Sequence, residues 1–275
     1  MAATLKNLIK KGTLAVPGAF NAATAMLIEK AGFKAVYISG AGLSNSSGMP
    51  DVGLIPREDV RALSSYIIDS VEIPAIVDVD TGFGGPAEVR KTVAAFESIG
   101  AQAIQIEDQV FPKRCGHIPG KEVIPAAQFA KKLRAAAAAR KDKGFLIIAR
   151  TDARAVEGIE GAIERAKIYL DAGADVIFPE ALTAKKEFSF FSSEVRAPLM
   201  ANMTEFGATP GITLDEFRQM KYSIVIFPMT CFRIAMKSIE AALGELKAKG
   251  TQKGLLKKMQ PREELYRLLG YKVTT

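Results

Sequence analysis

Residues 75–107 read AIVDVDTGFGGPAEVRKTVAAFESIGAQAIQIE: an apolar run, a glycine-rich loop, a helical pattern and a second apolar run. Both apolar runs are continuous rather than alternating, which is typical of parallel strands buried on both faces. Pro86 opens the helical pattern, and Gly100 follows it with the residue type that favours a left-handed helix terminus. The stretch therefore predicts a strand–helix–strand unit with a right-handed crossover.

The same alternation extends over nearly the whole chain. Eight short apolar runs are predicted as strands, at Thr13–Pro17, Ala35–Ser39, Ala75–Asp80, Ala103–Glu107, Leu146–Arg150, Asp175–Pro179, Leu199–Asn202 and Ile224–Phe227. Helical patterns lie between them, at Ala22–Ala31, Arg57–Ser70, Ala87–Ile99, Ala126–Arg140, Ile159–Ala172 and Leu214–Met220.

Eight such units predict an α/β fold that closes into a (β/α)8 TIM barrel, an architecture of about 250 residues. An open doubly wound sheet is the alternative, but no Gly-x-Gly-x-x-Gly motif follows the first run. We expect a single barrel domain over residues 1–275, with a C-terminal helical extension from about residue 243.

The composition is that of an ordinary globular protein, at 48% hydrophobic and 24% charged residues among 275. The net charge of +7 comes partly from Lys247–Lys258, where the absence of aromatic residues favours a solvated face over a nucleic-acid-binding surface. No apolar run reaches the ~18 residues of a membrane span. The N-terminus lacks the apolar core of a signal peptide, and two cysteines make no disulfide framework. We therefore expect a cytoplasmic protein with no membrane or nucleic-acid partner.

The segment Lys113–His117, KRCGH, gathers one of the two cysteines and the only histidine of the chain. Cations and an imidazole beside a thiol lower its pKa and increase the fraction of reactive thiolate. Between Pro112 and Pro119, the segment predicts a reactive Cys115 on a loop; the alternative is an incidental thiol between solvated cations. The second cysteine, Cys231, lies in an apolar stretch and is interpreted as buried and inert.

In such a barrel, functional side chains gather at the C-terminal ends of the strands. Asp78 and Asp80 share a face of one strand, where two carboxylates repel each other unless a cation or a proton lies between them. Oxygen ligands suit Mg²⁺, and Gly82 and Gly84 allow a close approach of the backbone. The pair favours a magnesium site; the alternative is that one carboxylate caps a helix and the other meets a buried arginine.

Polar residues also end the other predicted strands. Glu107 and Asp108 point to opposite faces, so only one of them enters the barrel mouth. Arg150 and Arg233 are suited to bind a substrate carboxylate through two hydrogen bonds, although a structural ion pair is the common alternative. The chain has no zinc-ligand spacing, no Gly-Lys-Ser/Thr phosphate loop and no Gly-x-Ser-x-Gly elbow.

Together these motifs resemble the isocitrate lyase/phosphoenolpyruvate mutase superfamily, and within it the methylisocitrate lyases. The resemblance extends from Pro17 to Arg233. The Lys113–His117 loop is typical of the lyases, whereas the mutases share the Asp78–Gly84 segment but lack the cysteine loop. Further matching segments are Ile106–Gln109, Ala149–Ala153, Phe178–Ala181 and Ala201–Gly207.

The resemblance implies a barrel whose last helix is swapped between subunits, usually in a homotetramer, with Mg²⁺ or Mn²⁺ as the cofactor. The implied metal site and its surroundings are Asp78, Asp80, Asp51 and Glu107. The implied catalytic residues are Cys115 as the acid on a mobile loop, Lys113, His117, and Tyr37 as one candidate for the base. The implied substrate-binding residues are Ser39, Gly40, Gly116, Arg150, Phe178, Glu180, Asn202, Thr204 and Arg233.

The implied reaction is the cleavage of a hydroxy-tricarboxylate, 2-methylisocitrate, to pyruvate and succinate in the methylcitrate cycle of propionate catabolism. Deprotonation of the hydroxyl group drives a retro-aldol (retro-Claisen-type) cleavage, after which Cys115 protonates the new succinate carbon. Phe178 stands where isocitrate lyases have a bulkier tryptophan, and the smaller ring leaves room for the methyl group of the substrate. A difference of one methyl group allows about 1–3 kcal/mol of discrimination between 2-methylisocitrate and isocitrate. A lyase for isocitrate or 2,3-dimethylmalate, and a non-catalytic carboxylate-binding protein, are the alternatives.

Overall fold

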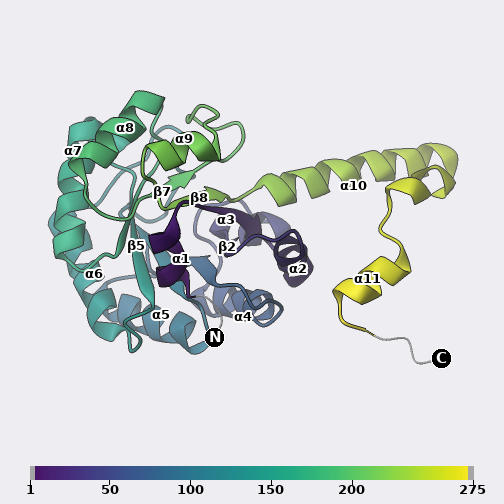
Figure 1. Cartoon of the computed structure of the whole chain (residues 1–275), viewed down its shortest axis with the longest axis horizontal. Coiled ribbons are helices and arrows are strands. Elements are labelled where there is room, and N and C mark those ends of the chain that lie inside the picture. The colour runs from purple at the N-terminus through teal and green to yellow at the C-terminus, as the bar shows by residue number, and fades with distance from the viewer. Residues whose placement is uncertain (1–3, 272–275) are drawn as a thin grey trace.

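The computed structural model describes residues 4–271 and shows eight parallel strands surrounded by helices (Figure 1). The strands are β1 (Leu14–Ala19), β2 (Val36–Ile38), β3 (Ala75–Asp78), β4 (Ala103–Glu107), β5 (Leu146–Thr151), β6 (Val176–Pro179), β7 (Met200–Asn202) and β8 (Ile224–Phe227). They pair in the order β6-β5-β4-β3-β2-β1-β8-β7. A parallel bridge between Ile177 and Leu199 joins β6 to the start of β7 and closes the barrel, so the predicted TIM-barrel fold is confirmed.

Helices follow most of the strands along the chain. They are α1 (Leu5–Lys11), α2 (Ala22–Lys30), α3 (Gly40–Ser46), α4 (Arg57–Ile68), α5 (Pro86–Ser98), α6 (Ala126–Ala139), α7 (Arg154–Asp171), α8 (Lys185–Glu194), α9 (Leu214–Gln219), α10 (Thr230–Lys249) and α11 (Arg262–Leu268), with a 3-10 helix η1 (Lys253–Lys258). Leu5 of α1 packs among the inward-facing side chains of the barrel, and its backbone N–H donates to Gln102. α1 therefore covers the N-terminal end of the barrel.

Two apolar layers stabilise this arrangement. The larger one fills the space between strands and helices, with Val77, Ile104 and Ile147 facing outward. The smaller one fills the barrel interior, where Ile76 and Ile148 come from the opposite faces of the same strands. Because both faces of every strand are buried, the strands read as continuous apolar runs in the sequence.

All eight predicted strands are found within two residues of their expected bounds. Three helices were not predicted: α1, α3 and α8. The sequence of α3, GAGLSNS, combines glycine and serine, which have low helix propensity. Ser39 compensates as the N-cap, because its hydroxyl accepts a hydrogen bond from Gly42 N at 3.3 Å.

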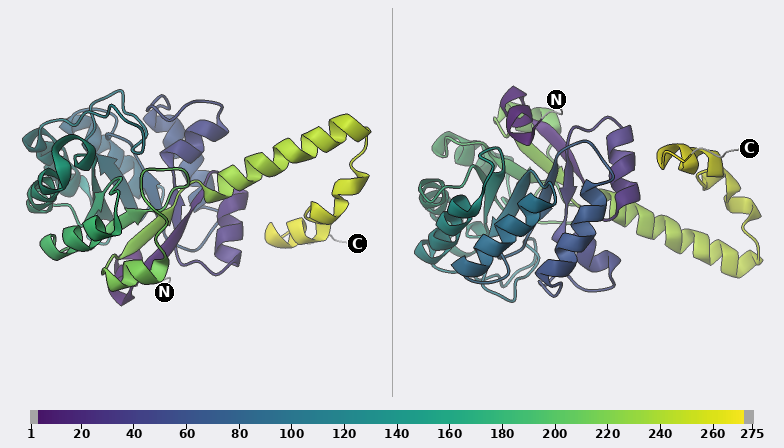
Figure 2. Two further views of the ribbon diagram at one scale, coloured as in Figure 1. Left: turned by 90° about the horizontal axis from the view of Figure 1, so that it is seen from above. Right: turned by 90° about the horizontal axis from the view of Figure 1, so that it is seen from below.

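α10 leaves the barrel wall as an arm that projects from the rest of the molecule, followed by η1 and α11 (Figure 2). Its first turns contact β1, and Phe232 packs edge-to-face against Phe20 of the barrel at 5.2 Å. The expected boundary of the extension, at about residue 243, lies inside this helix and stays a prediction. None of the helices described between residues 4 and 271 has the length and apolar character that crossing a membrane requires.

The closure of the barrel predicts a specific steric limit at Gly18 in β1. A methyl group there would overlap the carbonyl group of Pro228 and lie 2.8 Å from its Cα atom. We expect Gly18→Ala to lower the free energy of unfolding by about 1–3 kcal/mol or more, measured by urea denaturation. Gly211→Ala is the control, since a methyl group there meets no atom within 4 Å. Equal stability of the two variants would contradict the steric explanation.

Candidate active site

Alternate residues of the barrel strands point inward. Along each strand these residues change from apolar in the interior to polar at the C-terminal end. In β3, Ile76 lies in the apolar interior and Asp78 follows two residues later on the same face. In β5, Ile148 is followed in the same way by Arg150. The same parity brings Tyr37, Gln105, Glu107, Glu180 and Asn202 to the C-terminal end of the barrel. The register of the strands therefore collects the polar residues in one place.

A cavity of about 980 Å³ opens at this end of the barrel. Fourteen of the predicted site residues line it: Tyr37, Ser39, Asp51, Asp78, Lys113, Cys115, Gly116, His117, Arg150, Phe178, Glu180, Asn202, Thr204 and Arg233. The other three contact this lining without joining it: the N–H of Gly40 donates to Asp78, Asp80 pairs with Lys113, and Glu107 lies beside Arg150. The structure thus brings all the predicted residues together.

Three carboxylates and a lysine form the acidic part of the site. Asp78 accepts hydrogen bonds at 3.2 Å from the backbone N–H groups of Gly40 and Asp80. Burial raises the pKa of Asp78 to about 6, and the carboxylate of Asp80 adds to the rise. The ammonium group of Lys113 lies 2.9 Å from Asp80 and also pairs with Asp51. Lys113, expected to act on the thiol of Cys115, is therefore paired with these carboxylates instead.

Glu107 is fully buried, and burial raises its pKa well above the usual range. Within residues 4–271 neither of its oxygens has a hydrogen-bond partner, although Arg150 Nη1 lies 3.3 Å from Oε2. In the same part of the chain, no three histidine, cysteine or acidic side chains converge closely enough to bind a metal by themselves. The donor set fits Mg²⁺, which is usually held by one or two carboxylates and keeps several waters.

Arg150 is held by acids on two sides of the cavity floor, Asp152 and Glu107. Its Nε donates to Asp152 at 2.9 Å and its Nη2 donates to the other oxygen of Asp152 at 3.2 Å. The guanidinium group lies 5.5 Å from the centre of the Phe178 ring. Burial by itself would raise the pKa of Asp152, but Arg150 and Lys121 lower it to about 2. Arg150 therefore forms the structural ion pair that was the alternative to substrate binding, and it also lines the cavity.

Tyr37 is buried beneath the cavity, and its hydroxyl group donates to Gln105 Oε1 at 2.7 Å. Burial and the nearby carboxylate of Asp78 raise the pKa of Tyr37 well above its usual value. The hydrogen bond to Gln105 orients the Tyr37 hydroxyl group at the cavity, and its role as the base stays a prediction.

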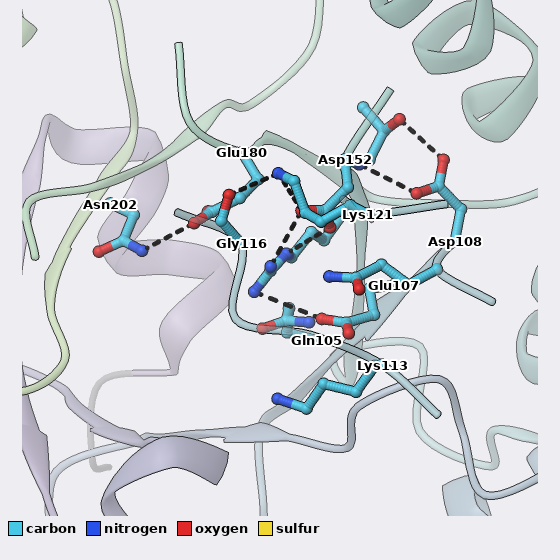
Figure 3. Close-up of polar contacts among 12 residues, drawn as sticks. Gln105, Glu107, Asp108, Lys113, Gly116, Lys121, Asp152, Glu180 and Asn202 are labelled. Carbon is cyan, nitrogen blue, oxygen red and sulfur yellow. Dashed lines mark hydrogen bonds and ion pairs between the residues drawn. The ribbon is translucent and has the colours of Figure 1, made fainter. Parts of the chain in front are cut away.

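The Lys113–His117 loop folds over the cavity and is fixed at both sides of Cys115. Gln109 accepts from Arg114 N and donates to Arg114 O, both at 2.9 Å. On the other side, Lys121 Nζ donates to the carbonyl group of Gly116 (Figure 3). Cys115 itself is half-buried and lines the cavity, as predicted for a thiol on a loop.

His117 lies between the loop and the strand ends. Its Nδ1 accepts a hydrogen bond from Ala208 N at 3.1 Å, so the proton is assigned to Nε2, which faces Glu180 Oε1 at 2.9 Å. Asn202 Nδ2 donates to the same Glu180 oxygen at 3.2 Å. Glu180 Oε2 and Asn202 Oδ1 have no hydrogen-bond partner among the described residues and are suited to meet polar groups of a ligand.

Arg233 lines the cavity with a half-exposed side chain. Its side chain is 43% exposed, its Nε is 3.4 Å from Glu205, and it lies over the ring of Phe206 at 5.4 Å. The buried polar residues of the site that sequence reasoning missed include Gln105, Gln109, Lys121 and Asp152. For Asp152 a signal existed, because it follows Arg150 by two residues and shares its face of the chain.

Two glycines allow the loop to pack this closely. A methyl group at Gly116 would overlap Arg150 Nη2 and lie 2.5 Å from Glu180 Cγ. A methyl group at Gly207 would lie 2.6 Å from His117 Nδ1. Neither glycine has a positive φ, so the requirement is for space rather than for backbone conformation.

This steric limit predicts that Gly116→Ala displaces the loop while leaving the barrel folded. We expect trypsin to cleave after Arg114 about tenfold faster or more in this variant, because opening the loop exposes its backbone. Cleavage is measured by mass spectrometry beside a thermal melt, with Gly211→Ala as the control. An unchanged cleavage rate at Arg114 would show that the loop tolerates the methyl group.

A family model described as phosphoenolpyruvate phosphomutase matches residues 5–247. A 2-methylisocitrate lyase of Aeropyrum pernix is 53% identical over 268 residues, which cover 97% of this chain and 86% of the relative. A probable 2-methylisocitrate lyase 1 of Corynebacterium glutamicum is 48% identical, covering 93% of this chain and 84% of the relative.

Solved structures agree with these sequence matches. A crystal structure of 2,3-dimethylmalate lyase, a member of the PEP mutase/isocitrate lyase superfamily, matches with a TM-score of 0.91 at 36% identity, covering 97% of this chain and 90% of that one. A phosphonopyruvate hydrolase complex with oxalate and Mg²⁺ matches with a TM-score of 0.88 at 29% identity, covering 97% and 93%. The resemblance proposed from the motifs is confirmed: this chain belongs to the phosphoenolpyruvate phosphomutase family, within the PEP mutase/isocitrate lyase superfamily.

Proposed function

We propose that this protein is a carbon–carbon lyase that cleaves 2-methylisocitrate to pyruvate and succinate. The observation that carries the proposal is the Lys113–His117 loop, which holds Cys115 over a cavity whose floor carries both acidic groups and a buried arginine. The 2-methylisocitrate lyases that match this chain are 41–53% identical over most of its length. The site combines binding groups for a polyanionic substrate with an acid on a loop that can exclude water.

The cavity residues have separate roles in substrate binding and in proton transfer. Arg150 offers positive charge to a substrate carboxylate, and the free oxygens of Glu180 and Asn202 offer acceptors for hydroxyl hydrogens. A base removes the proton of the substrate hydroxyl group, and the carbon–carbon bond then breaks. Pyruvate forms on one side, and the other half leaves as the dianionic aci form of succinate. Cys115 donates a proton to the new succinate carbon, which completes the products.

We propose Mg²⁺, with Mn²⁺ as a substitute, as the cofactor, bound by Asp78 and Asp80 with Asp51 and Glu107 around them. The closeness of Asp78 and Asp80 supports the proposal, because burial and the carboxylate of Asp80 raise the pKa of Asp78, and a bound cation would relieve this repulsion. A related structure, of phosphonopyruvate hydrolase, contains Mg²⁺ with oxalate. When bound, the metal would polarise the hydroxyl and carboxylate groups of the half that becomes the 2-oxo acid.

The second candidate substrate is 2,3-dimethylmalate, favoured by the structural match to a 2,3-dimethylmalate lyase. The two substrates differ at the end that becomes succinate, where 2-methylisocitrate carries a further carboxylate. Arg233, with its half-exposed side chain, is suited to meet that additional charge. We therefore favour 2-methylisocitrate.

We further propose that the protein acts in the cytoplasm, in propionate catabolism by the methylcitrate cycle, as a homotetramer. The projecting arm supports the assembly, because α10 exposes apolar side chains at helical spacing: Ile239, Leu243 and Leu246 are 50%, 59% and 43% exposed. Apolar residues on one face of a projecting helix are typical of a subunit contact. A swapped C-terminal helix would bury them.

The function is tested by pyruvate release from 2-methylisocitrate, with a parallel measurement on isocitrate and 2,3-dimethylmalate. We expect Mg²⁺-dependent pyruvate formation that falls by about 100-fold or more with EDTA, since a metal supplies several kcal/mol of charge stabilisation. Excess Mg²⁺ should restore the rate. A higher kcat/KM for 2,3-dimethylmalate would favour the second candidate, and no cleavage of any of these substrates would favour a carboxylate-binding protein.

The role of Cys115 as the acid predicts a loss of turnover in Cys115→Ser. Replacing a thiol acid by a hydroxyl group of much higher pKa is expected to lower kcat by about 10²- to 10⁴-fold with a small change in KM. Cys231→Ser is the matched control, because Cys231 is half-buried outside the cavity lining. Steady-state kinetics on both variants give the comparison; comparable activity would remove Cys115 from the mechanism.

A further inference from the structure

Lys121 is a buried lysine that neither the proposed reaction nor the metal site uses. Its side chain is 2% exposed, and its ammonium group has two partners. It donates to the carbonyl oxygen of Gly116 and, at 2.8 Å, to Oδ1 of Asp152 (Figure 3). A charge this deeply buried is costly unless it is paired and hydrogen-bonded, so these contacts determine where the side chain lies.

Lys121 stands at the anchored end of the loop rather than at its tip. The two stems of the loop pair with each other, through Val110 N and Glu122 O at 2.9 Å and a bridge between Gln109 and Val123. Lys121 comes directly before this paired stem, and its long side chain reaches back across the loop. It therefore connects a fixed part of the backbone to the Gly116–His117 peptide group, one residue beyond Cys115.

The peptide groups on the two sides of Cys115 are held by different side chains. Gln109 holds the backbone of Arg114, before the cysteine, through both its N–H and its carbonyl group. Lys121 holds the carbonyl group of Gly116, after the cysteine. The carbonyl group of Cys115 itself accepts from Ile118 N at 3.0 Å, so the backbone is held on both sides of the thiol, and Lys121 provides a charged donor on the far side.

The second partner of Lys121 links the loop to the cavity floor. Asp152 receives Lys121 on Oδ1 and Arg150 on both of its oxygens. The backbone N–H of Asp152 in turn donates to Asp108 at 2.9 Å, so the carboxylate is held from its own main chain. One fixed anion thus orients both the arginine that faces the substrate and the lysine that holds the loop.

We propose that Lys121 is a positioning residue that holds the loop closed with Cys115 over the cavity, through Gly116 and Asp152. This inference rests on the proposed lyase function, in which Cys115 is the acid. Without the ammonium group, the Gly116 carbonyl loses a charged donor and the loop loses its attachment to Asp152. Proton delivery by Cys115 should then suffer more than binding of the substrate, which contacts Arg150 and the strand ends.

The test compares Lys121→Met, which keeps the length of the side chain, with Lys121→Arg, which keeps the charge. Lys131→Met is the matched control, because Lys131 is exposed on α6. We expect Lys121→Met to lower kcat by about 10- to 100-fold, the range of a charge-assisted hydrogen bond, while KM changes by less than about threefold. Lys121→Arg should recover part of the loss, and Lys131→Met should behave as wild type.

A second measurement reports on loop closure independently of turnover. Wild-type Cys115 should be protected from iodoacetamide when Mg²⁺, pyruvate and succinate are present. The Lys121→Met variant should lose this protection even at ligand concentrations that saturate the variant. Modification of the Cys115 peptide is followed by mass spectrometry and ligand binding by calorimetry. If Lys121→Met fails to fold, the same protection measured in Lys121→Gln, which keeps one donor, decides the question.

The outcomes separate this inference from the function on which it rests. A wild-type protein that cleaves none of the candidate substrates overturns the proposed function. An active wild type together with a Lys121→Met variant of unchanged kcat and intact protection overturns the role of Lys121. A loss of stability with kcat and protection retained also overturns it, because Lys121 would then serve only the fold.

Discussion

The guanidinium group of Arg150 lies between the carboxylate of Asp152, at 2.9 Å, and that of Glu107, at 3.3 Å, inside the barrel. Each of these charges is buried, and a buried charge without a partner costs several kcal/mol. The groups are therefore stable only as a set. The same constraint extends to the loop, since Lys113 and Lys121 each pair with buried or half-buried carboxylates of the strand ends. Charge compensation thus draws the loop onto the barrel and brings Cys115 with it.

Steric contacts, together with these ion pairs, determine how closely the loop packs on the barrel. Gly116 and Gly207 leave no room for even a methyl group, because Arg150, Glu180 and His117 occupy the adjacent space. This close packing fixes the backbone beside Cys115, while the thiol itself lines the cavity, where a bound substrate would displace water. Catalysis needs a loop that can open as well as close. The contacts of this loop with the barrel are accordingly a few polar and steric ones rather than a large apolar surface.

Much of the site could be predicted from single residues and their spacing. The apolar run before Asp78 and Asp80 placed both at the barrel mouth, but the expectation that they share a strand face was wrong: β3 ends at Asp78, and Asp80, with a φ of 48°, lies beyond the strand. The loop with Cys115 was visible from composition alone. The expectation that Lys113 acts on the neighbouring thiol was wrong. In the folded chain its ammonium group pairs with Asp80 and Asp51 instead. Contacts between residues 30 or more positions apart leave no local pattern.

The amino-acid sequence by itself determined the barrel, the edge at which its polar residues gather and the loop that carries the thiol. These features depend on local periodicity, and parallel strands translate that periodicity directly into a common face and a common edge. Only the tertiary structure decided which charges compensate one another. The pairing of Lys121 with Asp152 joins residues 31 positions apart, and it exists because closure of the barrel places β5 beneath the loop. The energy of such a pair depends on distance and burial, which no spacing in the chain specifies.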